Sequence, residues 1–384
     1  MALNLASLVV FKYAGFLVEN CNALFGAAFR IPQISLPIGI SFYTFQALSY
    51  SVDVYRKDVG AQRSYWKFLL YVSMFPQLIA GPIVRYVDVA AQIESRESDP
   101  ENVFRGVTRF CVGLGKKVLL ADHVGQVADQ LLGGSFTGAT TLGIWLGALM
   151  YMFQIYFDFS GYSDMAIGLG RIFGFRYMEN FKLPYTSKSI SEFWRRWHIS
   201  LSSFFRDYVY IPLGGNRKHV YLNLFIVWAL TGLWHGASWT FVLWGLGFAV
   251  LLVAEKLLYK ERLEKTHVLK HVYVLLFVTL SFVLFNASSV KEAALQIGAM
   301  FGADGLPLVS AESLYYAKSY AVTFLIAVIG ATPLCKNVVF RLAESARGAQ
   351  VLAILQPVWL VLLLAACTAF LVDGSFNPFL YFRF

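Results

Sequence analysis

The sequence predicts an all-α, polytopic membrane protein, and three observations lead to that prediction. Hydrophobic residues make up 58% of the 384-residue chain. Charged residues make up only 14%, whereas a soluble domain carries about a quarter. The mean hydropathy is +0.58, and apolar segments that could form whole or partial membrane spans follow one another along nearly all of the chain.

We expect one integral-membrane domain over residues 1–384, crossing the cytoplasmic (inner) cell membrane several times. The first apolar stretch has neither the charged start nor the cleavage site of a signal peptide, so we expect it to remain as a spanning or docked helix. The predicted spans or half-spans, with a weaker one at Val107–Leu120, are Leu5–Phe25, Leu36–Val52, Phe68–Ile83, Leu142–Ile167, Leu222–Leu233, Ser238–Leu252, Val272–Phe285, Ala321–Leu334 and Val351–Val372.

Loop charge predicts which ends of these segments face the cytoplasm. The formal net charge is +9, and the basic residues cluster in short loops, which is the pattern of the positive-inside rule rather than of a nucleic-acid-binding surface. The loop that holds Arg56, Lys57, Arg63 and Lys67 is therefore expected to be cytoplasmic. The same holds for the basic segment Arg171–Lys218 and for the loop that follows Glu255.

This assignment constrains the apolar passage Tyr221–Glu255. Because both of its ends are expected on the cytoplasmic side, the passage must enter the membrane and return, with its turn at Trp234–Ser238. Irregular backbone at that depth is tolerated only where protein encloses it or where it lines a cavity. We therefore expect His235 in the wall of an internal cavity.

His235 has two interpretations. It is either a packed histidine hydrogen-bonded to a backbone carbonyl or a general base, since an imidazole can take a hydroxyl proton near neutral pH. Gly232 and Gly236 would allow close backbone approach beside it, and tryptophans flank it, which favours the base. Ser238 and Trp239 are candidates for the donors that would stabilise an oxyanion.

A second polar stretch, Ser189–Tyr208, predicts a helix opened by a Ser189-x-x-Glu192 capping box. Its aromatic and aliphatic residues recur at helical spacing, which is also typical of a helix lying along the cytoplasmic leaflet. His198 falls close to that apolar face, so it could look into a cavity. Arg195 and Arg196 could meet the phosphates of an acyl donor.

Other titratable residues carry weaker hypotheses. Asp158 and Asp164 either line the same cavity as His235 or accept structural hydrogen bonds, and their helical phase argues against a paired acid and base unless Ser160-Gly161 breaks the helix. His267 and His271 have metal-ligand spacing without a third ligand, so we expect no metal site.

Long motifs in the chain resemble the membrane-bound O-acyltransferase family, in its bacterial branch that includes the membrane subunit of alginate O-acetylation. They cover most of Lys12–Lys256. The matching stretches are Leu36–Gln46, Ala80-Gly-Pro82, Tyr156-Phe-Asp-Phe-Ser-Gly-Tyr-Ser-Asp-Met165, Glu192-Phe-Trp-Arg-Arg-Trp-His-Ile-Ser-Leu201, Arg206-Asp-Tyr208, Leu213-Gly-Gly-Asn216 and Gly232-Leu-Trp-His-Gly236. Members of this branch usually carry further membrane helices ahead of the segment that resembles Phe11–Cys21.

The resemblance implies helices arranged around a transmembrane tunnel, with amphipathic helices at the interface and a catalytic stretch over residues 156–239. It implies His235 as the essential histidine and His198 as its companion. Apart from the resemblance, we expect the donor to be held by Arg195, Arg196, Trp197 and Trp234, the arginines through their charge. No bound cofactor is implied. Acetyl-CoA would enter from the cytoplasm as a substrate, and an extracytoplasmic acetyltransferase or a polysaccharide-export protein would be the partner, beside membrane lipids and without nucleic acid.

Three functions therefore remain open. The first is O-acetylation of an exported polysaccharide such as alginate. The second is D-alanyl transfer from a carrier protein to teichoic acid, for which Arg171–Lys218 could supply a docking surface. The third is a proton-coupled transporter in which His235 and the acidic residues relay protons.

Overall fold

The architecture is described from a computed structural model, whose described residues are 1–79, 81–133, 139–374 and 379–380. Ala80, part of one motif named above, lies outside them. Regular structure within these residues is entirely helical, which confirms the predicted fold class. Five helices among them are long and apolar enough to cross a membrane: Ala2–Phe25, Thr141–Ile172, Trp239–Tyr259, Leu269–Asn286 and Ala346–Asp373. The pair α17 and α18, bent by 53°, gives a sixth if it is one broken span.

The helices follow one another with short connections. The first ten α-helices are α1 (Ala2–Leu8), α2 (Ala14–Phe25), α3 (Ile40–Arg56), α4 (Tyr65–Ser73), α5 (Phe75–Leu78), α6 (Tyr86–Glu94), α7 (Pro100–Gly115), α8 (Asp122–Leu132), α9 (Thr141–Ile172) and α10 (Ile190–Arg196). The others are α11 (Ile199–Phe205), α12 (Val220–His235), α13 (Trp239–Ala254), α14 (Lys260–Glu264), α15 (Leu269–Asn286), α16 (Val290–Met300), α17 (Ala311–Ser319), α18 (Ala321–Gly330), α19 (Leu334–Ala343) and α20 (Ala346–Asp373).

Four π-helical segments interrupt or extend these helices, namely η1 (Val9–Tyr13), η2 (Lys116–Ala121), η4 (Arg206–Tyr210) and η5 (Glu255–Tyr259). Single π-turns of this kind are rare in proteins as a whole, and those that occur are often at functional sites. Two short 3-10 turns, η3 (Pro184–Thr186) and η6 (Ala303–Gly305), complete the regular structure of the described residues.

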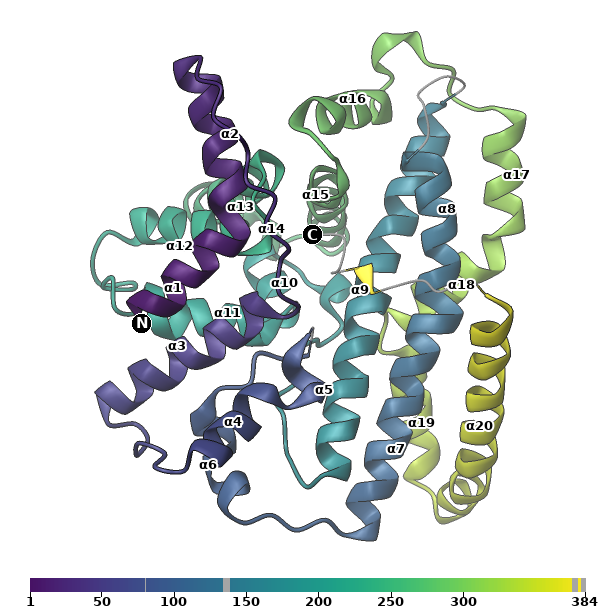
Figure 1. The fold of residues 1–384 in the computed structure, drawn as a ribbon. Coiled ribbons are helices and arrows are strands. Elements are labelled where there is room, and N and C mark those ends of the chain that lie inside the picture. Colours follow the sequence, from purple (N-terminus) through teal and green to yellow (C-terminus); the bar gives the residue numbers. More distant parts are fainter. Residues whose placement is uncertain (80, 134–138, 375–378, 381–384) are drawn as a thin grey trace.

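The long helix α9 is the centre of the molecule. Thr140 caps its start by accepting a hydrogen bond from the Gly143 amide at 3.0 Å. The continuous helix α7–η2–α8 lies along it, with α20 on the outer side of α7 (Figure 1). The two helices approach closely enough that a Cβ on Gly113 would lie 2.5 Å from the Gly161 carbonyl oxygen. Small residues at such a crossing are typical of helix packing in membranes.

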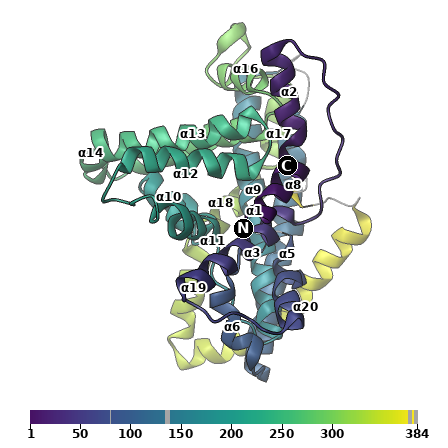
Figure 2. The same ribbon diagram turned by 60° about the vertical axis from the view of Figure 1, so that its left-hand side comes forward.

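Helices α12 and α13 form the antiparallel hairpin that the sequence predicts for Tyr221–Glu255, with the turn at Gly236–Ser238. Ser238 caps α13 by accepting a hydrogen bond from the Thr240 amide at 3.3 Å. The hairpin extends crosswise from α9, with α14 at its far end (Figure 2). Helix α15 packs against both α9 and α13, so these three helices surround the space beside the turn.

Two predicted helices prove to be broken. The expected span Phe68–Ile83 is wrong as one helix, because α4 ends at Ser73 and the short α5 ends at Leu78. The helix predicted over Ser189–Tyr208 starts at its Ser189 cap, as expected, but divides into α10 and α11. His198 separates them in a left-handed conformation, with φ of 44°.

The close contact inside the hairpin gives a test of the fold. A Cβ on Gly245 would lie 2.2 Å from the Trp228 carbonyl oxygen, whereas one on Gly247 would meet no atom within 4 Å. We expect Gly245→Ala to destabilise the protein by about 2 kcal/mol, since backbone must move apart. Gly247→Ala should be neutral or stabilising by up to about 1 kcal/mol, because alanine favours helix. Thermal unfolding of each variant in detergent, monitored by size-exclusion chromatography, gives the two unfolding midpoints. Equal midpoints for Gly245→Ala and Gly247→Ala would contradict the packing described.

Candidate active site

His235 is the last residue of α12 and is 8% exposed. Its ring lies edge-on to three aromatic rings, with centroid distances of 4.9 Å to Trp234, 5.0 Å to Trp244 and 5.2 Å to Phe285. Within the described part of the chain, its Nδ1 atom is buried and has no hydrogen-bond partner. The alternative interpretation was a ring nitrogen bound to a backbone carbonyl. The Nδ1 atom of His235 makes no such bond in the structure.

The His235 ring forms part of the wall of a narrow, mostly apolar cavity of about 30 Å³, enough for one or two water molecules. Sequence analysis predicted such a wall position for this residue. The cavity lies between α9, α13 and α15, and the chain segment Phe379–Leu380 closes part of it beside α9 (Figure 1). The residues lining it are Ile155, Asp158, Phe159, Trp197, His235, Trp244, Phe282, Phe285, Phe379 and Leu380.

The two carboxylates of α9 have different environments. Asp158 lines the cavity; its Oδ1 lies 2.7 Å from Lys117 Nζ, and its Oδ2 accepts a hydrogen bond from the Leu380 amide at 2.7 Å. Asp164 lies one and a half turns further on, and it pairs with Lys116 at 2.6 Å and with Arg109 at 2.8 Å. Because α9 continues unbroken through Ser160 and Gly161, the two carboxylates do not act as a pair.

His198 is buried beside the same tryptophan as His235. Its ring centroid is 5.8 Å from that of Trp234, and the Trp234 ring also contacts His235. His198 Nδ1 lies 3.2 Å from the amide oxygen of Asn180, which accepts from a protonated Nδ1 and leaves the lone pair on Nε2. Burial lowers the pKa of His198 to about 3, so the ring is neutral at physiological pH.

The four residues expected to hold the donor do not form one cluster. Arg195 is exposed, whereas Arg196 is bound within the protein, 2.6 Å from Glu192 and 3.0 Å from the Thr186 hydroxyl. Trp197 lines the cavity, and Trp234 is buried behind His235. Their role in donor binding stays a prediction.

The two candidate oxyanion donors named from the sequence lie away from the cavity, and a third candidate lines it. Ser238 is used as a helix cap, and the Trp239 indole donates to Asn20 Oδ1 at 2.8 Å on an exposed surface. Neither lines the cavity. Trp244 does, and its indole N–H is buried without a hydrogen-bond partner among the described residues. The sequence shows Trp244 only as one more aromatic residue of an apolar helix.

Two further predictions concerned metal and loop charge. His271 contacts the Ser187 carbonyl oxygen at 3.0 Å, and the described residues contain no group of three metal-ligating side chains. The two loops predicted to share the cytoplasmic face are in contact, because Arg56 donates to the Asp207 carbonyl oxygen at 3.2 Å.

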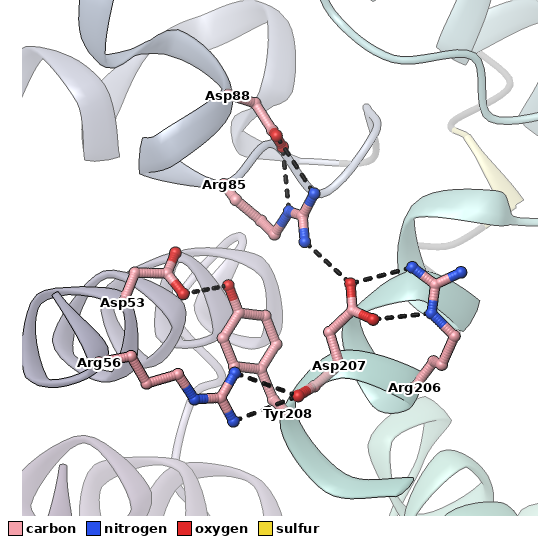
Figure 3. A network of polar contacts seen from close by, with 7 residues as sticks. All are labelled: Asp53, Arg56, Arg85, Asp88, Arg206, Asp207 and Tyr208. Atoms are coloured by element: carbon pink, nitrogen blue, oxygen red, sulfur yellow. Dashed lines mark hydrogen bonds and ion pairs between the residues drawn. The ribbon is translucent and has the colours of Figure 1, made fainter. Parts of the chain in front are cut away.

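A network of acidic and basic side chains joins α3, α6 and η4 at this face (Figure 3). Asp207 lies 3.0 Å from Arg85, and the Tyr208 hydroxyl donates to Asp53 at 2.7 Å. These residues line a polar cleft of about 560 Å³. The other oxygen of Asp53 is buried and has no partner within the described residues. Arg56, whose guanidinium also lies over the Tyr208 ring, borders the same cleft.

Comparison with known proteins agrees with this arrangement. The model of the membrane-bound O-acyltransferase family matches residues 47–291, which hold both histidines. A probable alginate O-acetylase from Pseudomonas putida is 41% identical over all of this chain and 83% of its own length. A peptidoglycan O-acetyltransferase from Helicobacter pylori is 36% identical over 79% of this chain and 64% of its own.

A more distant relative is a teichoic acid D-alanyltransferase from Bacillus subtilis, 30% identical over 56% of this chain and 58% of its own length. The family model and the Pseudomonas putida relative span the hairpin, the cavity helix α9 and the segment around His198. The chain therefore belongs to the membrane-bound O-acyltransferase family and is a multi-pass membrane O-acyltransferase.

Proposed function

We propose that this O-acyltransferase takes an acetyl group from cytoplasmic acetyl-CoA and passes it to a hydroxyl on the outer side of the membrane. The acceptor is an exported polysaccharide or a partner acetyltransferase that acts on one. The observation that carries the proposal is the Nδ1 atom of His235, which has no partner among the described residues and lies in the wall of a mostly apolar cavity. A buried neutral imidazole is suited to act as a general base.

In the proposed step, His235 takes the proton of the acceptor hydroxyl, and the freed oxygen attacks the thioester carbonyl carbon. The carbon–sulfur bond then breaks, and the departing thiolate takes the proton from the imidazolium. The Trp244 N–H is proposed to donate to the oxyanion between these events. His198, held through Asn180, lies across the Trp234 ring and is proposed to support the position of that ring.

The likeness to the alginate O-acetylase and to the peptidoglycan O-acetyltransferase supports acetyl as the transferred group. D-alanyl transfer is the second candidate, because a relative is named for it.

Replacing His235 tests the base. We expect His235→Ala to lower acetyl transfer by at least about a hundredfold, because general base catalysis contributes roughly 10²–10⁴. The matched control is His267→Ala, which removes an exposed histidine outside the cavity and should keep activity. Transfer of radiolabel to polymer in membrane vesicles is the measurement, with the amount of folded protein determined in parallel. Retained transfer in the His235 variant contradicts the proposal.

Trp244→Phe tests the oxyanion donor. Removing one such donor costs about 10²–10³ in kcat, so we expect a loss of that size with little change in KM. Trp194→Phe is the control, because the Trp194 N–H is also buried without a partner among the described residues, yet it does not line this cavity. Equal kcat values for the two variants would show that the Trp244 N–H plays no part in the reaction.

A donor experiment separates the two candidate functions. Inverted vesicles are supplied with labelled acetyl-CoA or with a D-alanyl carrier protein, and label in the polymer fraction is measured. We expect label from acetyl-CoA alone. Label only from the carrier would establish D-alanyl transfer instead, and solute flux without any acyl donor would favour transport.

A further inference from the structure

The carbonyl groups at the end of α12 have no partners within the helix, because a helix leaves its last four carbonyls unpaired. Two side chains of η1 satisfy three of them. The Tyr13 hydroxyl donates to the Leu233 oxygen at 2.5 Å, and Lys12 Nζ donates to the oxygens of Trp234 and His235, at 2.5 and 3.1 Å. The turn that presents His235 is therefore held from a helix more than 200 residues earlier in the chain.

The same helix holds the far side of the turn. The Phe16 ring lies 5.8 Å from that of Trp239, and Asn20 accepts the hydrogen bond from the Trp239 indole. Lys12, Phe16 and Asn20 recur at helical spacing, so one face of α1–η1–α2 supports the whole break between α12 and α13. Lys12 and Tyr13 both belong to the π-helical segment η1.

The charge of Lys12 has no carboxylate partner among the described residues. Its ammonium binds two carbonyl oxygens at a helix C-terminus, where the macrodipole favours a cation, and lies 3.1 Å from the Ser41 hydroxyl. The titratable groups that surround His235 from the other elements are His198 and the cavity residue Asp158, which is paired with Lys117. Lys12 is therefore the one unpaired positive charge described next to the His235 backbone.

We propose that Lys12 is a positioning residue for the reaction of His235. It fixes the turn that carries the imidazole, and its positive charge disfavours the imidazolium form, so the ring stays neutral before the reaction and releases its proton readily afterwards. The catalytic meaning of this inference rests on the proposed function. The hydrogen bonds of Lys12 to the turn, and the effect of its charge on the protonation of His235, do not depend on the proposed function.

Activity measurements on three variants test the inference. We expect Lys12→Met to lower kcat by about tenfold to a hundredfold with KM within about twofold, since a small displacement of a reacting group has that cost. The acid limb of its pH profile should move to higher pH by about one unit, because a nearby positive charge is lost. Lys12→Arg should restore the wild-type acid limb. Asn20→Leu removes the uncharged contact with Trp239 on the far side of the turn, and it should leave the acid limb at its wild-type pH. An unchanged limb in Lys12→Met overturns the proposal.

A second readout does not depend on acyl transfer. Site-resolved NMR of the purified full-length protein in detergent, with isotope-labelled histidine, gives the protonation state of the His235 ring at each pH. We expect the pH midpoint at His235 to rise by about one unit in Lys12→Met while that at exposed His267 stays constant. If wild-type protein transfers no acetyl group but this shift is found, the proposed function fails and the electrostatic role stands. The same midpoint in both proteins refutes the role of Lys12.

Discussion

A broken helix inside the membrane must have its backbone polar groups satisfied by the protein, because hydrocarbon offers no hydrogen bonds. The break between His235 and Ser238 meets this requirement from both sides. Lys12 and Tyr13 bind the last carbonyls of α12, and Ser238 caps the first turn of α13. These bonds hold the buried end of α12, and with it the His235 ring, in place.

Each of the four π-helical segments among the described residues contributes polar contacts between helices. η1 carries Lys12 and Tyr13. η2 carries the neighbouring lysines that pair with Asp158 and Asp164. η4 carries residues of the network at the basic face, and η5 carries a buried glutamate, Glu255, whose Oε2 accepts the hydrogen bond of the Ile190 amide at 2.7 Å and so helps to cap α10. Single π-turns are rare in proteins and are often found at functional sites.

The break at His198 shows where pattern reasoning failed. The apolar spacing from Phe193 to Tyr208 continues across it, so the sequence predicts a single helix. In the structure, contacts with the segment around Asn180 replace the hydrogen bonds of the helix. The Ile199 amide donates to the Asn180 carbonyl oxygen at 3.0 Å, and the Asn180 side chain binds Ser200 and lies against His198. These bonds are tertiary, and no periodicity within one segment reveals them.

The sequence by itself determined the membrane class, the helical hairpin and the position of His235 at its turn, because hydropathy and loop charge act locally along the chain. Only the tertiary structure decided which polar groups meet: Lys12 with the end of α12, Asp158 rather than Asp164 with the cavity, and Trp244 with His235. Helical spacing fixes the face on which a side chain lies, whereas its partner on a distant helix depends on how the helices pack.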